Sequence, residues 1–296
     1  TMTAYWLITG LLSLGVLAVL GVLQTMHAWR LEARVRRLAE HVHRVREGDL
    51  AARPAPDGGA DVIGRLRDDV AETTARLQAA RRARERLVAD AAHELRTPLA
   101  AMRAQIDTTL RRTRSAEELR EALETSGAEV DRLARLSDRL LDLAQLARGA
   151  DPMGPADLRA VVDAAVSSAR GVAEARGQAL LVRGPAAAPL SGDPAALRQA
   201  VDNLLTNALR HGPDGSVVEL VLAPTAGGWQ LGVIDEGPGV SPGAAAQLFE
   251  PFARGDHSHG GAGLGLAIVR AVARRHGGEI SAAPGPGGRF TLELPA

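Results

Sequence analysis

One histidine near the middle of the chain is placed where a side chain can react. His93 stands two residues before Leu95, which belongs to the apolar stripe of an expected helix, so its imidazole lies about 200° around that helix and faces solvent. The neighbouring Glu94 can orient or deprotonate one ring nitrogen, so that the other attacks as a neutral nucleophile. Thr97, four residues on, shares the exposed face. The stripe itself consists of Leu87, Ala91, Leu95, Leu99, Met102 and Ile106.

Two asparagines and one aspartate in the second half of the chain suit a phosphorylated ligand. Asn203 and Asn207 are four residues apart on one face of an expected helix, where a carboxamide oxygen can bind Mg²⁺ without adding negative charge near phosphates. Asp235 ends an expected strand at a turn that contains Gly237 and Gly239. Glycine lets a flat base approach the backbone there, so that an exocyclic amine can donate to the carboxylate.

A glycine-rich run adds a phosphate cradle. Phe249 and Phe252 supply apolar anchors, and Arg254 supplies a cation ahead of the run. The run enters an expected helix, whose free N–H groups and positive dipole end suit phosphate. Its residues are Gly261, Ala262, Gly263, Leu264, Gly265 and Leu266.

Hydrophobic periodicity predicts a helical half followed by an α/β half. From residue 31 to 148 the chain is charged and helical in period, with a break at 48–61 and a turn at 111–115 that closes a hairpin too apolar on one face to be stable alone. A Gly/Pro-rich linker at 149–155 marks a domain boundary. Later helices are expected at 157–175, 194–211 and 264–276, and strands at 179–183, 217–222, 229–236, 278–283 and 289–295. Short turns between consecutive strands predict a two-layer α/β sandwich and not a Rossmann fold.

Composition excludes several kinds of chemistry. The chain has no cysteine, so disulfides, thiolate zinc sites and cysteine nucleophiles are excluded. Its 35 basic residues balance 35 acidic residues, and only 2% of the chain is aromatic. Without a basic field or rings for base stacking, no nucleic-acid partner is expected.

The N-terminal segment from Tyr5 to Leu23 is uncharged and 19 residues long. As a helix it rises roughly 28 Å, which matches a hydrocarbon core of ~30 Å, so a transmembrane helix is expected over 5–26. The arginines that begin at Arg30 place the rest of the chain in the cytoplasm. A secretory signal peptide is the alternative, but no basic segment precedes the run and no cleavage site follows it. We expect a single-pass protein of the cell membrane that contacts lipid, without an extracytoplasmic domain in this chain, because four residues precede the run.

Two coiled-coil stripes follow the apolar segment, one on each side of the break at 48–61. The first consists of Leu31, Val35, Leu38, Val42 and Val45, and the second of Ile63, Leu66, Val70, Thr73 and Leu77. Two short amphipathic helices joined by a connector after a membrane helix resemble a HAMP relay module. Val62 stands where that family usually has Glu. A generic charged helical stalk is the alternative.

The string His-Glu-Leu-Arg-Thr-Pro-Leu at 93–99 resembles the H-box of sensor histidine kinases of two-component systems. That resemblance implies a phosphoacceptor His93, a Thr97 that positions water for the reverse phosphatase reaction, and a homodimer in which two hairpins form a four-helix bundle. In the same order as in that family, DNLLTNALRHG, DEGPGV, FEPFAR and GAGLGL resemble the N, G1, F and G2 boxes of the GHKL (Bergerat) ATP-binding fold.

The resemblance also implies residue roles at the ATP site. Asn207 would hold Mg²⁺, Asp235 would accept from the adenine amino group, and the glycines of the run at 261–266 would contact the triphosphate. Arg210 and His211 stand where the family usually has Lys or Arg and then Tyr.

Two rival functions belong to other classes. ATPases of the gyrase type resemble the same segment but carry a water-activating Glu four residues before the Mg²⁺ asparagine, where this chain has Asn203. A degenerate kinase that acts as a scaffold or phosphatase is disfavoured by the intact His93, Asn207 and Asp235. The sequence therefore predicts a kinase that phosphorylates itself from ATP·Mg²⁺ and passes the phosphoryl group to a response regulator receiver domain. The expected domains are a transmembrane helix at 5–26, a HAMP-like linker at 27–80, the hairpin at 81–148, a linker at 149–155 and the ATP-binding domain at 156–296.

Overall fold

A computed structural model of the chain describes most of its 296 residues. The described residues are 2–54, 56, 61–113, 115–146, 153–243, 245, 247–253 and 262–296. In the first helix, side chains are described for Leu12 and from Leu14 onward. The chain forms two compact units, residues 1–88 and 89–296.

The first unit begins with helix α1, Met2–Arg46. Among the described residues, one helix is long and apolar enough to cross a membrane, and it is the part of α1 from Leu14 to Arg46. The apolar side chains described there are exposed, from Leu12 at 64% to Trp29 at 77%. Soluble proteins rarely expose a continuous apolar surface of this size, so we expect lipid or another protein chain to cover it.

The connector after α1 returns to it through an ion pair. Arg34 donates to both oxygens of Asp61 at 2.7 and 2.8 Å, and Asp61 also accepts from the backbone N–H of Gly64 at 3.0 Å. The Arg34 hydrogen bonds hold the pKa of Asp61 far below its usual value. Asp61 thereby fixes the start of helix α2, Val62–Leu110. His41 of α1 is 2% exposed, and among the described residues its ring nitrogens have no hydrogen-bond partner.

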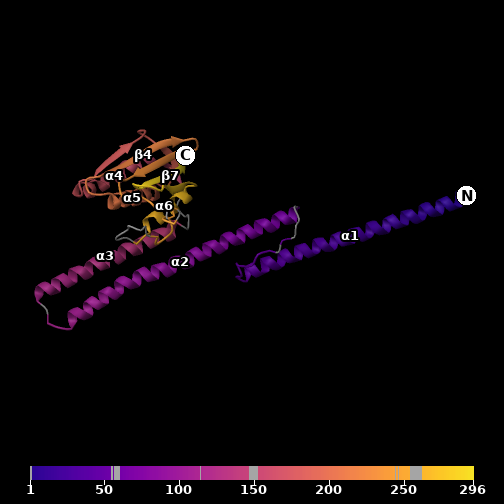
Figure 1. Cartoon of the computed structure of the whole chain (residues 1–296), viewed down its shortest axis with the longest axis horizontal. Coiled ribbons are helices and arrows are strands. Elements are labelled where there is room, and N and C mark those ends of the chain that lie inside the picture. The colour runs from indigo at the N-terminus through magenta and orange to yellow at the C-terminus, as the bar shows by residue number, and fades with distance from the viewer. Residues whose placement is uncertain are drawn as a thin grey trace. The chain divides into compact units, whose positions relative to one another are not determined.

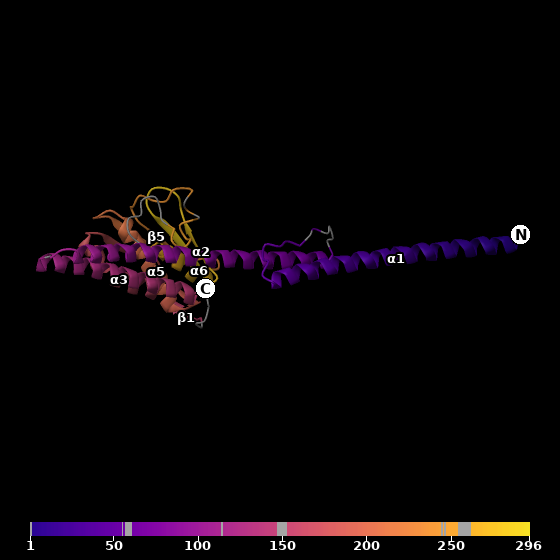
Figure 2. The same ribbon diagram turned by 90° about the horizontal axis from the view of Figure 1, so that it is seen from below.

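Helix α2 extends into the second unit and is followed by α3, Ala116–Leu146. Figures 1 and 2 show α3 running back antiparallel to α2 after a short turn. Ser115 and Glu118 form a capping box at the start of α3: the Ser115 N–H donates to Glu118 Oε2 at 2.9 Å, and the Glu118 N–H donates to Ser115 Oγ at 3.2 Å. The predicted hairpin is confirmed.

The apolar surface of the hairpin is partly open to solvent in a single chain, although Leu136 and Leu146 are buried. The large apolar side chains of the hairpin that are 43% or more exposed are Val88, Leu99, Ile106, Leu110, Leu119, Leu123, Val130 and Leu141. The stripes in the first unit are open as well, at Leu31, Val35, Val42, Leu66 and Leu77. These helices leave apolar surface that needs a partner.

The rest of the second unit is the predicted two-layer α/β sandwich. Its elements are β1 (Gly154–Asp157), α4 (Leu158–Ala175), β2 (Ala179–Arg183), β3 (Pro189–Gly192), α5 (Pro194–His211), β4 (Val217–Thr225), β5 (Gly228–Ile234), α6 (Gly265–Arg275), β6 (Glu279–Ala282) and β7 (Arg289–Pro295). The main sheet has the order β2-β4-β5-β7-β6, with β2 parallel to β4 and the other neighbours antiparallel. Helices α4, α5 and α6 cover one face of it (Figure 1).

Aspartates cap two of these helices. Asp157 accepts from the N–H of Arg159 at 2.9 Å at the start of α4, and Asp193 accepts from those of Ala195 and Ala196 at 2.9 and 3.2 Å at the start of α5. The core beneath consists of aliphatic side chains, of which Leu158, Leu197, Leu204, Leu205, Leu220, Leu222, Leu231, Ile268 and Leu292 are fully buried. Leu143 and Leu146 from the end of α3 pack against this core.

A buried histidine joins the start of α5 to the end of α6. His276 Nδ1–H donates to the Val272 carbonyl at 2.8 Å, and its Nε2 accepts from the Asp193 N–H at 3.0 Å. Arg275 pairs with the Asp193 carboxylate at 3.3 Å. These contacts join the start of α5 to the end of α6, while the start of α6 at Gly265 lies against Asn203 in the middle of α5.

Most predicted elements of the sandwich are confirmed to within two or three residues, but a two-stranded sheet was missed. β1 pairs antiparallel with β3, from Gly154 opposite Gly192 to Asp157 opposite Pro189. The prediction placed residues 154 and 155 in a linker. Each strand has four residues and contains proline and glycine, so neither has an alternating pattern to detect.

Candidate nucleotide site and phosphoacceptor helix

Asp235 is a buried carboxylate at the end of β5. It is 4% exposed and directly follows the strand. Its N–H donates to the Gly288 carbonyl at 2.9 Å, and its Oδ1 accepts from the N–H groups of Gly237 at 2.8 Å and Gly288 at 3.1 Å. Among the described residues no hydrogen bond reaches Oδ2. Two backbone donors therefore orient the carboxylate and leave one oxygen for a donor on a ligand.

The turn that carries Asp235 is pressed against the turn before β7. A Cβ atom on Gly288 would lie 2.0 Å from Asp235 Oδ2, and one on Gly287 would lie 2.7 Å from the Asp235 carbonyl oxygen. Gly239 has a φ of +83°, and a Cβ atom there would lie 1.8 Å from the Gly285 carbonyl oxygen. These backbones approach closely only because no side chain separates them.

Helix α5 lies between this turn and the first turn of α6. Asn203 and Asn207 are half-buried on α5, and a Cβ atom on Gly265 would lie 2.9 Å from Asn203 Oδ1. At the end of α5, the His211 carbonyl oxygen lies 2.8 Å from where a Cβ of Gly237 would be. The structure thus brings the predicted asparagine helix, the Asp235 turn and the glycine-rich helix start together.

Helix α6 begins without a side-chain cap, unlike α4 and α5. Its N-cap residue is Leu264, which is fully buried and makes no side-chain capping hydrogen bond, while Leu266 is half-buried. The first N–H groups of a helix have no intrahelical acceptor, and the dipole favours an anion there. This end of α6 can therefore bind phosphate.

The phenylalanine segment closes onto the start of α6. The Phe252 N–H donates to the Gly263 carbonyl at 2.9 Å, and a Cβ atom on Gly263, whose φ is +66°, would lie 2.6 Å from the Ala253 carbonyl oxygen. Phe249 is buried and packs edge-to-face on Phe290 with ring centroids 6.4 Å apart. The predicted site residues Arg254 and Gly261 lie outside the described residues.

His211 is the last residue of α5, and it faces the turn that carries Asp235. Partial burial lowers the pKa of its imidazole below the usual 6.5, the adjacent Arg210 lowers it further, and Asp235 partly opposes both. Arg210 itself is exposed. His211 is therefore disposed to be neutral at pH 7.

His93 is exposed on α2, as the periodicity predicts. Glu94 beside it is half-buried, and exposed Thr97 donates its hydroxyl to the His93 carbonyl at 3.3 Å. The exposed face of this helix thus presents the imidazole and the Thr97 side chain one turn apart.

Comparison with known proteins identifies the family. Residues 192–296 match the family described as "Histidine kinase-, DNA gyrase B-, and HSP90-like ATPase", and residues 83–149 match the "His Kinase A (phospho-acceptor) domain". The sensor protein CutS of Streptomyces coelicolor is 35% identical over 296 residues, which cover 96% of this chain and 71% of CutS. This chain belongs to the sensor histidine kinases.

Two further matches describe how this sensor histidine kinase relates to known proteins. The probable sensor histidine kinase TcrY of Mycobacterium tuberculosis is 38% identical over 259 residues, 85% of this chain, so the chain spans about half of TcrY (54%). The histidine kinase ThkA, solved in complex with the response regulator protein TrrA, is 18% identical, with a TM-score of 0.60 over 74% of this chain and 66% of that one. That likeness concerns the fold.

The sequence analysis missed Gly287 and Gly288 as parts of the site of this kinase. The pair reads locally as the turn of the last hairpin. Its contact with Asp235 joins residues 53 positions apart in the chain, and no local pattern reveals such a contact. It also missed His276, which holds α5 and α6 together through Asp193.

We expect Gly288→Ala to weaken ATP binding at least tenfold. The new methyl group would occupy the place of Asp235 Oδ2, so the carboxylate or the turn must move. The dissociation constant for ATP, measured by calorimetry, checks this. Gly171→Ala on α4 is the control, because its Cβ would have no atom within 4 Å. An unchanged affinity in Gly288→Ala would contradict the role of this close approach.

We expect His211 to make the ATP-binding domain less stable in acid. Because burial lowers its pKa when folded, the unfolded chain binds more protons at this residue as the pH falls through about 6.5, so stability decreases below that pH and is unaffected above it. Replacing His211 by Gln removes this contribution. The loss of unfolding temperature between pH 7.5 and 5.5 should be smaller in His211→Gln than in the wild type or in His43→Gln, whose histidine is exposed. An equal loss of unfolding temperature in His211→Gln and the wild type would contradict this role of His211.

Proposed function

We propose that this chain is the membrane-anchored catalytic part of a sensor histidine kinase that phosphorylates His93 from ATP and passes the phosphoryl group to an aspartate of a response regulator receiver domain. The observation that carries the proposal is the oriented, buried Asp235 in a chain that also presents an exposed His93. One group recognises the nucleotide and the other is free to react.

The site residues have distinct roles in this proposal. Asp235 accepts the adenine amino group through Oδ2, while Gly237 and Gly239 let the base approach the backbone. The glycines of the run, Gly261, Gly263 and Gly265, receive the triphosphate together with Arg210, and the last of them begins α6. Phe252, whose N–H donates to the Gly263 carbonyl, closes the site, and Arg254 supplies a cation.

The residues also fit a magnesium ion bound with the nucleotide. Mg²⁺ usually keeps several waters and binds one or two protein oxygens plus substrate phosphates, so the carboxamide of Asn207, aided by Asn203, is sufficient. Among the described residues no cluster of three His, Asp or Glu side chains forms a cage of its own. When bound, the ion neutralises phosphate charge.

Phosphoryl transfer then uses the exposed face of α2. A neutral ring nitrogen of His93 gives its lone pair to the γ-phosphorus, the bond to the bridging oxygen breaks, and ADP leaves with that electron pair. Glu94 accepts the proton of the other ring nitrogen. Thr97 positions water for the reverse, phosphatase reaction. In contrast to a gyrase-type ATPase, Asn203 stands where a water-activating carboxylate would be needed, so transfer to protein is favoured over hydrolysis.

The partners follow from surfaces of the same chain. The open apolar stripe of α2 and α3 supports a homodimer with a four-helix bundle. The exposed α1 segment supports insertion in the cell membrane at 5–26, with the HAMP-like linker, hairpin and ATP-binding domain in the cytoplasm. ThkA, found with TrrA, supports a response regulator as the recipient.

We expect His93→Gln to abolish autophosphorylation and keep nucleotide binding. Glutamine cannot form the phosphoramidate, while the ATP site lies on other elements. The measurement is protein-bound label from γ-labelled ATP that is acid-labile and base-stable. Persistent label of this kind would overturn the assignment, and undiminished ADP production without label would favour the ATPase alternative.

We expect Asp235→Asn to reduce ATP affinity by roughly 10- to 150-fold, because a hydrogen bond to a charged group contributes about 1.5–3 kcal/mol. Asn has nearly the same shape, so the turn should persist. Calorimetric titration with ATP tests this, and the thermal unfolding midpoint of the variant is the control for folding. An unchanged dissociation constant would remove the adenine role.

A further inference from the structure

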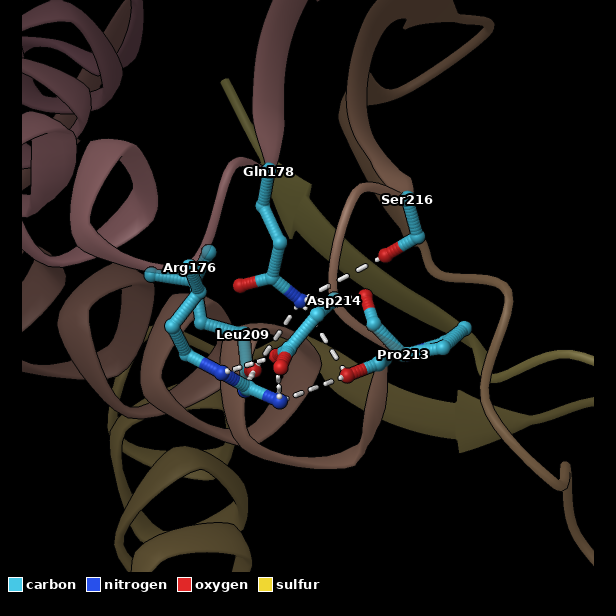
Figure 3. Close-up of polar contacts among 7 residues, drawn as sticks. Arg176, Gln178, Leu209, Pro213, Asp214 and Ser216 are labelled. Carbon is cyan, nitrogen blue, oxygen red and sulfur yellow. Dashed lines mark hydrogen bonds and ion pairs between the residues drawn. The ribbon is translucent and has the colours of Figure 1, made fainter.

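The end of helix α5 is held by two side chains from a distant part of the domain. Arg176 is the C-cap of α4, and Gln178 immediately precedes β2. Figure 3 shows both reaching from that junction to the last turn of α5 and the following loop, at residues 209–216. They lie more than 30 positions away in sequence.

Arg176 binds two backbone carbonyls and one carboxylate. Its Nη1 donates to the Leu209 carbonyl and its Nη2 to the Gly212 carbonyl at 3.2 Å. Its Nε donates to Asp214 Oδ1 at 2.8 Å (Figure 3). The Asp214 side chain is 76% exposed, so that ion pair contributes little, and the carbonyl contacts matter more.

Gln178 is 5% exposed and faces only acceptors through its amide nitrogen. Nε2 lies 3.2 Å from the Leu209 carbonyl oxygen, 3.1 Å from that of Gly212 and 3.0 Å from that of Pro213. The Ser216 hydroxyl oxygen is a fourth acceptor at 3.4 Å. Turning the amide over would place its oxygen against these oxygens, so the surroundings select one orientation.

The sequence of α5 makes these donors necessary. A helical carbonyl normally accepts from the N–H four residues on, and the residue four after Leu209 is Pro213, which has no N–H. The last helical bond runs from the Gly212 N–H to the Ala208 carbonyl at 2.8 Å, and the next carbonyl, that of Leu209, accepts from the side chains of Arg176 and Gln178. The positive guanidinium is also favourable at the negative end of the helix dipole.

The last turn of α5, which Arg176 and Gln178 contact, also borders the proposed nucleotide site. Asn207, Arg210 and His211 lie on it or beside it, and the His211 carbonyl packs against Gly237, next to Asp235. Packing this close transmits small shifts, because no gap absorbs them. Movement of the α5 end would therefore change the separation between the phosphate-binding and adenine-binding residues.

We propose that Arg176 and Gln178 are positioning residues for ATP: through the Leu209 and Gly212 carbonyls they set the last turn of α5 against the Asp235 turn. The inference rests on the proposed function, in which ATP bridges these two elements. Neither side chain needs to touch the nucleotide.

The test compares two arginines that make the same kinds of contact. Arg159, at the start of α4, also binds a carboxylate, Asp163, at 2.9 Å and a loop carbonyl, Pro185, at 2.9 Å, but no part of α5. In the full chain in detergent, we expect Arg176→Met to raise the KM and dissociation constant for ATP·Mg²⁺ at least fivefold while kcat at saturating ATP falls less than twofold. Arg159→Met should lower the unfolding temperature about as much as Arg176→Met does, but should leave the KM, the dissociation constant and kcat within twofold of the wild type.

Two further variants separate an effect on ATP binding from a general loss of stability. Arg176→Lys restores a donor to the Leu209 carbonyl and should recover part of the affinity, and Gln178→Leu should weaken ATP binding like Arg176→Met. Wild-type affinity in both Arg176→Met and Gln178→Leu, or an equal weakening in Arg159→Met, would overturn the inference and leave the proposed function intact. Absence of ATP binding in the wild type would instead overturn the proposed function.

Discussion

The buried carboxylate of Asp235 is the constraint on which the ATP-binding domain depends. An ionised group at 4% exposure is costly unless it is hydrogen-bonded, and here two backbone N–H groups, from Gly237 and Gly288, satisfy one oxygen. That arrangement requires β5 and β7 to be neighbours and requires turns without side chains where they meet. The sheet order and the glycines together orient Asp235 so that its Oδ2 can accept a hydrogen bond from a ligand.

Helix α5 lies between the Asp235 turn and the proposed phosphate-binding start of α6, and distant residues fix both of its ends. At its start, Asp193 caps the helix and is bound by His276 and Arg275 from the end of α6. At its end, Arg176 and Gln178 donate to the Leu209 carbonyl, which Pro213 leaves without a backbone donor. A helix held at both ends keeps Asn203 and Asn207 in a fixed position relative to the residues proposed to bind adenine and phosphate.

The helical half of the chain, in contrast, is held by few buried contacts among its described residues. Its ion pairs are mostly i,i+4 pairs on exposed faces, which contribute little to stability, and its apolar stripes are open. The sandwich has a closed core, to which Leu143 and Leu146 of α3 also contribute, whereas the exposed apolar side chains of α1, α2 and α3 need lipid or a second chain to cover them.

The sequence by itself determined the local features: the helices of the sandwich, the exposure of His93, the hairpin turn and the order of the nucleotide motifs. These depend on periodicity, capping and turn residues within a few positions of one another. Only the tertiary structure decided that Gly288 orients Asp235, that Arg176 and Gln178 hold α5, and that β1 pairs with β3. These contacts join residues 30 or more positions apart, and a hydrogen bond between such residues depends on the packing of the whole sheet and its helices, which local residue patterns do not encode.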